Sequence, residues 1–127
     1  MIKGIHHVSI LTSDVSRSVR FYSGILGLPL SDQRPELGFD GAWFDLGGQQ
    51  IHLIHPDPVA DPEKPDVRCG RDRHVAFQVE NIEELIERLV SAGIEFERSR
   101  SGRPALFCRD PDGNALEFIG IVDPATS

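Results

Sequence analysis

The chain has 127 residues, 39% of them hydrophobic, a size that suits one compact globular domain. Its 20 acidic residues outnumber 13 basic ones and give a formal net charge of −7, which disfavours binding to nucleic acid or to anionic membranes and leaves a small molecule or a protein as partner. Cys69 and Cys108 are too few for a disulfide framework, and no stretch has signal-peptide or membrane-spanning character, so we expect a cytoplasmic protein.

The first half predicts a strand, a helix and three further strands. Residues 5–12 are rich in apolar and β-branched side chains, and Ser13-Asp14 then offers a helix N-cap. An apolar stripe at helical spacing predicts a helix that ends near Gly24 and Gly27; it consists of Val15, Val19, Tyr22 and Leu26. An edge-like strand starts at Leu28, and residues 41–46 and 49–54 read as a hairpin around Gly47-Gly48. The order is βαβββ.

The second half predicts the same order. Asn81 and Glu84 have capping-box spacing at the start of a helix that ends at Ala92-Gly93, and strands follow at residues 94–97, 105–108 and 114–121. We therefore expect one domain over residues 1–127, with repeats at about residues 4–55 and 71–122 and a proline-rich linker at about residues 56–70. The fold class is α+β, with two tandem βαβββ modules that form an open, curved mixed β-sheet and carry their helices on its outer face.

The two halves also repeat a chemical pattern. His7 opens the first strand of one half and His74 that of the other, an offset of 67 (74 − 7). His52 and Glu117 lie in the closing strands, with an offset of 65 (117 − 52). Imidazole nitrogens and a carboxylate suit a borderline divalent ion, so these four side chains predict one divalent metal ion per site: zinc, nickel, cobalt, manganese or iron.

Strand alternation supports this grouping. Large apolar side chains share one parity and should pack on the helices; they are Val8, Ile10, Ile51, Leu53, Val75, Phe77, Val79, Leu116 and Phe118. The four candidate ligands share the opposite, more polar parity with Ser9. His6 and His55 have the apolar parity, so we do not expect them to be ligands.

Further residues are candidates for substrate binding. Arginines gather around the predicted site and suit a carboxylate or a phosphonate, although a solvated loop is an alternative interpretation; they are Arg71, Arg73, Arg98, Arg100 and Arg103. We take Arg100 and Arg103 as the substrate-binding candidates, together with Ser9 and Trp43. Core packing is the alternative for Trp43-Phe44.

The chain closely resembles the vicinal oxygen chelate superfamily, which includes glyoxalase I, fosfomycin-resistance proteins, methylmalonyl-CoA epimerase, extradiol dioxygenases and bleomycin-resistance proteins. The most specific matching segments are residues 5–8, 21–22 and 26–28 in the first half and residues 110–118 in the second. The resemblance implies that each half curls around a divalent metal that chelates two neighbouring substrate oxygens. It also implies a homodimer, in which His7 and His52 join His74 and Glu117 of the same chain or of the other subunit.

The resemblance implies a metal-dependent enzyme, and the leading hypothesis is a lyase or isomerase of the glyoxalase I (lactoylglutathione lyase) type. Its substrate is expected to be a small molecule with vicinal oxygens, either anionic or a thiol conjugate. Glu117 is the leading candidate for the catalytic base and His52 the second. Bacterial glyoxalase I has a glutamate where His52 stands, whereas fosfomycin-type and dioxygenase-type proteins match His7, His74 and Glu117. The alternatives are therefore a fosfomycin-type thiol transferase, an extradiol dioxygenase, or a metal-free protein that binds a drug or metabolite.

Overall fold

The computed structural model describes residues 1–56, 68–99 and 104–121. The chain divides into two compact units, Met1–Glu63 and Lys64–Ser127. Most of the expected linker lies outside the described residues, as do Arg100 and Arg103. In the described ranges, no helix combines the length and the apolar character needed to cross a membrane. Each unit contains its own sheet and helix, as the predicted duplication requires.

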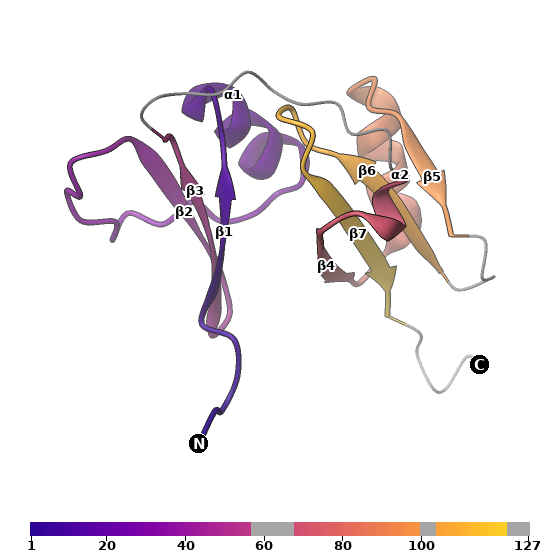
Figure 1. The fold of residues 1–127 in the computed structure, drawn as a ribbon. Helices are drawn as coiled ribbons and strands as arrows, with labels where there is room; N and C mark the ends of the chain where they lie inside the picture. The colour runs from indigo at the N-terminus through magenta and orange to yellow at the C-terminus, as the bar shows by residue number, and fades with distance from the viewer. Residues whose placement is uncertain (57–67, 100–103, 122–127) are drawn as a thin grey trace. The chain divides into compact units, whose positions relative to one another are not determined.

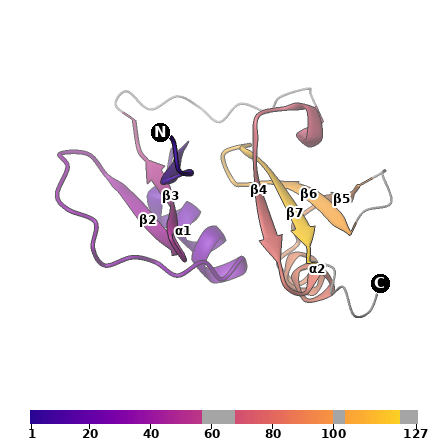
Figure 2. The same ribbon diagram turned by 90° about the horizontal axis from the view of Figure 1, so that it is seen from below.

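The first unit is a three-stranded sheet with a helical segment on one face (Figures 1 and 2). Its elements are β1 (His7–Leu11), α1 (Val15–Val19), the π-helix η1 (Arg20–Ile25), β2 (Gly41–Leu46) and β3 (Gln49–Ile54). The strand order is β1-β3-β2, with β1 parallel and β2 antiparallel to β3. β3 is therefore the central strand of this sheet, and its side chains are flanked on both sides.

The helical segment of the first unit begins and ends as predicted. Asp14 is the N-cap, and its Oδ1 accepts a hydrogen bond from the backbone N–H of Arg17 at 3.0 Å. The segment ends at Gly27, whose φ of 80° lies in the left-handed region, and Leu28 N–H then donates to Tyr22 O at 2.9 Å. The α-helical part is short, because the turn from Arg20 onward is wound as a π-helix.

The edge strand expected to start at Leu28 is reduced to one bridge. The structure forms a single isolated bridge between Leu30 and Phe44. Its backbone bonds run from Asp45 N–H to Pro29 O at 2.9 Å and from Ser31 N–H to Trp43 O at 2.8 Å. Pro29 has no N–H to extend the ladder, and Gly38 at φ 80° turns the chain again before β2. The segment between Ser31 and β2 is therefore a loop.

The second unit is a four-stranded sheet in the order β4-β7-β6-β5, with β4 parallel to β7 and the other pairs antiparallel. Its elements are the 3₁₀ turn η2 (Cys69–Arg71), β4 (His74–Val79), α2 (Ile82–Ser91), β5 (Phe96–Arg98), β6 (Ala105–Arg109) and β7 (Ala115–Gly120). α2 lies behind the strands in Figure 1. Asn81 caps it as predicted by accepting from Glu84 N–H at 3.1 Å.

The predicted apolar parity forms the core of each unit. Ile51 and Leu53 of β3 are buried in the first unit, and Leu116 and Phe118 of β7 in the second. The helices add Tyr22 on one side and Leu85 and Leu89 on the other. Because β3 and β7 are the central strands of their sheets, residues on their opposite parity are also covered by neighbours. This is why the polar candidates His52 and Glu117 are buried.

Cys108 on β6 provides a test of burial in the second unit. Desolvation raises the pKa of its thiol to about 12, whereas Cys69 is half-buried. Only about one in ten thousand Cys108 thiols is then ionised at about pH 8, and the thiolate is the reacting form. We expect an aromatic disulfide reagent to titrate one thiol rapidly in the native protein and the second only after unfolding. Two equally fast thiols in the native protein would contradict this packing.

Candidate functional site

The first unit brings His7, His52 and Trp43 into one aromatic stack. Trp43 and His52 are paired across β2 and β3, and their ring centroids lie 4.1 Å apart at an interplanar angle of 5°. His7 covers the other face of His52, with centroids 3.9 Å apart and an angle of 16°. His52 is consequently only 8% exposed. Since imidazole lone pairs lie in the ring planes, a cation held by both histidines must lie at an edge of this stack.

A short chain of hydrogen bonds orients His52. The Gln50 side-chain amide donates from Nε2 to Asp45 Oδ1 at 2.9 Å, and a carboxylate only accepts, so Gln50 Oε1 is the atom that faces His52. His52 Nε2 lies 2.9 Å from that oxygen and is therefore the donor. The lone pair of neutral His52 is left on Nδ1.

The charge state of His52 favours ligation. Burial lowers its pKa, and electrostatic repulsion by His7, His6 and Arg34 lowers it further. The neutral imidazole, which is the metal-binding form, is thereby favoured near neutral pH. His6 was not expected to be a ligand; in the structure it is exposed, and its Nδ1 lies 2.8 Å from His7 Nδ1, so one of the two rings donates to the other.

The second unit brings the other two candidates together. His74 Nε2 lies 3.1 Å from Glu117 Oε1, and Glu117 is only 7% exposed. On the other side of the ring, His74 Nδ1 lies 2.9 Å from the backbone carbonyl of Asp72. A carbonyl only accepts, so Nδ1 carries the hydrogen. A neutral His74 then presents its Nε2 lone pair to the Glu117 carboxylate.

This pair fits a shared cation. An imidazole lone pair and a carboxylate are both acceptors, so their contact requires either a proton on Nε2 or a cation that both coordinate. The donor set in each unit is chemically suited to a borderline divalent ion, with two nitrogens in the first and one nitrogen and one oxygen in the second. Within residues 1–56, 68–99 and 104–121, no group of three or more His, Cys, Asp and Glu side chains forms a metal-binding cluster. Each unit by itself supplies two candidate ligands.

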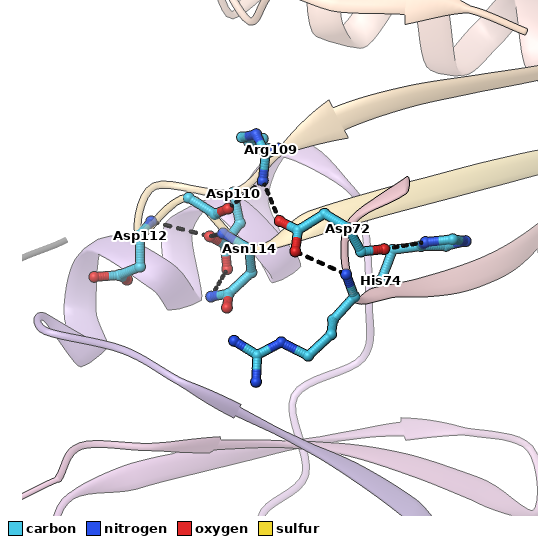
Figure 3. Close-up of polar contacts among 8 residues, drawn as sticks. Asp72, His74, Arg109, Asp110, Asp112 and Asn114 are labelled. Atoms are coloured by element: carbon cyan, nitrogen blue, oxygen red, sulfur yellow. Dashed lines mark hydrogen bonds and ion pairs between the residues drawn. The ribbon is translucent and has the colours of Figure 1, made fainter. Parts of the chain in front are cut away.

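Asp72 contacts the His74 ring and Arg109 in turn holds Asp72, and the sequence analysis predicted neither residue (Figure 3). Arg109 Nη1 donates to Asp72 Oδ2 at 3.0 Å and to Gly113 O at 2.8 Å, and Arg73 N–H donates to Asp72 Oδ1 at 2.8 Å. The hydrogen bond from Arg109 is the main reason that the pKa of Asp72 is lowered. No local pattern predicts this contact, because its partners are 37 residues apart.

The turn before β7 is organised by Asp110. Its buried carboxylate accepts at Oδ1 from the backbone N–H groups of Asp112 and Asn114, at 2.9 and 2.8 Å. Its Oδ2 accepts from Asn114 Nδ2 at 2.8 Å, and Gly113 takes a φ of 86° (Figure 3). Asx-type bonding of this kind holds a tight turn without regular structure. The turn sets where β7 begins, and thus where Glu117 lies.

The substrate-binding candidates are placed in part. Ser9 is exposed on β1 and is the register partner of His52, and Trp43 stacks on His52, so both lie beside that candidate ligand. Phe44, the other member of the aromatic pair, is in the core. Arg98 forms an ion pair with Glu83, with Nη1 3.9 Å from Oε1. Of Trp43 and Phe44, only Trp43 thus lies on the same face of the sheet as His52.

The two units define the class of protein: a duplicated strand–helix–strand module with a ligand-type pair of side chains on the first and last strands of each copy. The chain belongs to the glyoxalase/bleomycin resistance protein/dioxygenase superfamily, whose family model matches residues 4–118. The α+β fold predicted from the sequence is confirmed, with two βαβββ-like modules and open mixed sheets.

Individual relatives agree with this assignment. The chain is 35% identical over 125 residues to Glyoxylase I 4 of Arabidopsis thaliana, covering 92% of this chain and 70% of that protein. A crystal structure of a glyoxalase-family protein from Bacillus anthracis has a TM-score of 0.76 and 29% identity, covering 96% of this chain and 98% of that one. A variant of the fosfomycin resistance protein FosX from Listeria monocytogenes, in complex with Mn(II) and a dihydroxypropylphosphonic acid, has a TM-score of 0.74 and 19% identity, covering 96% and 95%.

Proposed function

We propose that the protein is a divalent-metal-dependent enzyme of this superfamily and that His7, His52, His74 and Glu117 are the metal ligands. The observation that carries the proposal is the contact of His74 Nε2 with Glu117 Oε1 at 3.1 Å, with Nδ1 already committed to the Asp72 carbonyl. A neutral histidine held this way directs its lone pair at a carboxylate, which suits a cation better than it suits a structural hydrogen bond. The stacked pair His7 and His52 contributes two more nitrogen donors.

The reaction we propose is a glyoxalase I-type isomerisation or lyase reaction on a small substrate with vicinal oxygens. When bound, a divalent metal stabilises negative charge on a chelated substrate oxygen and so acidifies the neighbouring C–H group. Glu117 is the base that takes this proton and returns it to the adjacent carbon, because its carboxylate is buried and lies at the candidate ligand position. His52 is the second candidate for this role, since its lowered pKa keeps the imidazole neutral and so able to accept a proton.

Four residues are proposed to bind the substrate. Trp43 offers an aromatic face beside His52, and Ser9 offers a hydroxyl on the neighbouring strand. Arg100 and Arg103 would take an anionic group, such as a carboxylate of a thiol conjugate. The 35% identity to Glyoxylase I 4 supports a glyoxalase I-type reaction over a thiol-transferase or dioxygenase reaction.

We also propose that the active form is a homodimer.

The proposal is tested on protein purified without a histidine tag. Elemental analysis is expected to find a bound divalent metal, and adding zinc, nickel, cobalt, manganese or ferrous iron to metal-free protein is expected to restore isomerisation of the methylglyoxal–glutathione hemithioacetal. Fosfomycin with a thiol, and catechols with oxygen, are assayed in parallel. Turnover of only one of these substrates would show that the protein is a thiol transferase or a dioxygenase rather than a glyoxalase I-type enzyme. Chelator-resistant binding of a ligand without turnover would favour a metal-free binding protein.

A further inference from the structure

We infer that Arg109 and Asp72 are positioning residues, which hold the His74 ring by its Nδ1–H group so that Nε2 faces Glu117. This inference rests on the proposed function in that His74 is taken as a ligand, but it concerns the protein before any metal binds. Three connected contacts carry it: Arg109 to the Asp72 carboxylate, Asp72 to the His74 ring, and Arg109 to the turn that precedes Glu117 (Figure 3).

The Asp72 carbonyl is a fixed acceptor because both ends of Asp72 are held. Its backbone N–H donates to Arg68 O at 3.0 Å within the turn at η2, and its side chain accepts from Arg109 and from Arg73 N–H. A carbonyl held in this way bonds only a ring nitrogen that carries hydrogen. His74 therefore carries its hydrogen on Nδ1, which leaves Nε2 as the ligand atom.

Arg109 also couples the two candidate ligands of this unit. Its Nη1 bonds both Asp72 Oδ2, two residues before His74, and Gly113 O, in the turn that leads into β7 and Glu117. The Arg109 guanidinium thus fixes the position of the start of β4 relative to the start of β7. The ion pair is partly buried, with side-chain exposures of 24% for Arg109 and 20% for Asp72, so solvent screens it less than a surface pair.

The test uses the full-length chain with Arg109→Met, which keeps the side-chain stem and removes both hydrogen bonds. Arg88→Met is the matched control, because Arg88 lies in the same unit and pairs with Glu84 in an exposed helical pair, with exposures of 47% and 58%. Asp72→Asn is a second variant that keeps the backbone carbonyl and removes the charge. The two measurements are the protonation of His74 Nδ1, from two-bond ¹H–¹⁵N correlations of metal-free protein at about pH 8, and Mn²⁺ affinity by calorimetry.

We expect wild type and Arg88→Met to show a hydrogen on His74 Nδ1, and Arg109→Met and Asp72→Asn to show a population that has lost it. Mn²⁺ affinity should fall about 10- to 100-fold in both positioning variants, as for other residues that orient metal ligands. Unchanged protonation of Nδ1 and unchanged affinity in Asp72→Asn and in any folded Arg109→Met would overturn the inference. If wild type binds no Mn²⁺ but the hydrogen on Nδ1 still depends on Asp72, the proposed metal site fails while the positioning role stands.

Discussion

Replacing His74 by alanine is expected to abolish stoichiometric metal binding, with a fall in divalent-metal affinity of on the order of 100-fold or more. The loss should exceed that of its supporting residues, because a ligand contributes directly to the bond whereas its partners only orient it. Glu117→Gln should have a comparable effect, since it keeps the shape of a buried side chain and removes the anionic oxygen 3.1 Å from His74 Nε2. The measurement is calorimetric titration of metal-free protein with Mn²⁺ or Zn²⁺.

His55→Ala serves as the control for the loss of an imidazole. His55 follows β3 and is half-buried, and its parity excludes it from the candidate ligands. The variant should bind metal as wild type does. Circular dichroism and thermal unfolding of each variant establish that the fold is retained. If His74→Ala and His55→Ala bind metal equally well, His74 is not a ligand and the proposed site is wrong.

Replacing Gly41 by alanine is expected to destabilise the protein by about 3 kcal/mol, in the range seen when atoms are forced into a packed structure. A Cβ at this first residue of β2 would overlap the backbone carbonyl of Leu53 on β3 and lie 3.1 Å from Arg34 Nη2. A backbone carbonyl in a paired strand cannot move aside as a flexible side chain does, so the hairpin must shift. Thermal unfolding should show a fall in Tm of about 10 °C.

The same substitution at Gly24 is expected to have the opposite sign. Gly24 lies in η1, a Cβ there meets no atom within 4 Å, and its φ is not positive. Alanine should therefore stabilise the protein by about 0.5 kcal/mol, because it reduces the freedom of the unfolded chain. Equal Tm values for Gly41→Ala and wild type would mean that the β2–β3 pairing is looser than described.

Gly41 also connects the stability of the first sheet with metal binding at the candidate site. It begins the strand that carries Trp43, and Trp43 stacks on His52. A shifted β2 should therefore weaken metal binding as well as folding, although less than His74→Ala does. This order of effects separates a residue that shapes the sheet from one that coordinates.

The elements that local rules govern were predicted closely. Residues 41–46 and 49–54 form the hairpin that the apolar alternation and the Gly47-Gly48 turn indicated, and Asp14 and Asn81 cap the two helices. Each of these features depends on residues a few positions apart, so a short window contains the whole signal. The expected strand at Leu28 is reduced to an isolated bridge, because a strand extends only as far as a neighbour pairs with it, and here pairing stops after Ser31.

The candidate ligands were found because duplication makes them visible. His7 and His74 start equivalent strands, and each lies close to its expected partner, with His7 stacked on His52 and His74 in contact with Glu117. The side chains that orient these ligands were not predicted. Gln50 and Asp45 orient His52, and Asp72 and Arg109 orient His74, through side-chain contacts that no repeat or periodicity encodes.

The sequence by itself determined the duplicated βαβββ order, the core faces of the strands and the four candidate ligands, since these follow from alternation, capping and repetition along the chain. Only the tertiary structure decided that His52 and Glu117 are buried on central strands, and which nitrogen of His52 and of His74 carries the hydrogen. Tautomer and burial depend on which distant groups pack against a ring, and that contact is a property of the folded chain rather than of its local pattern.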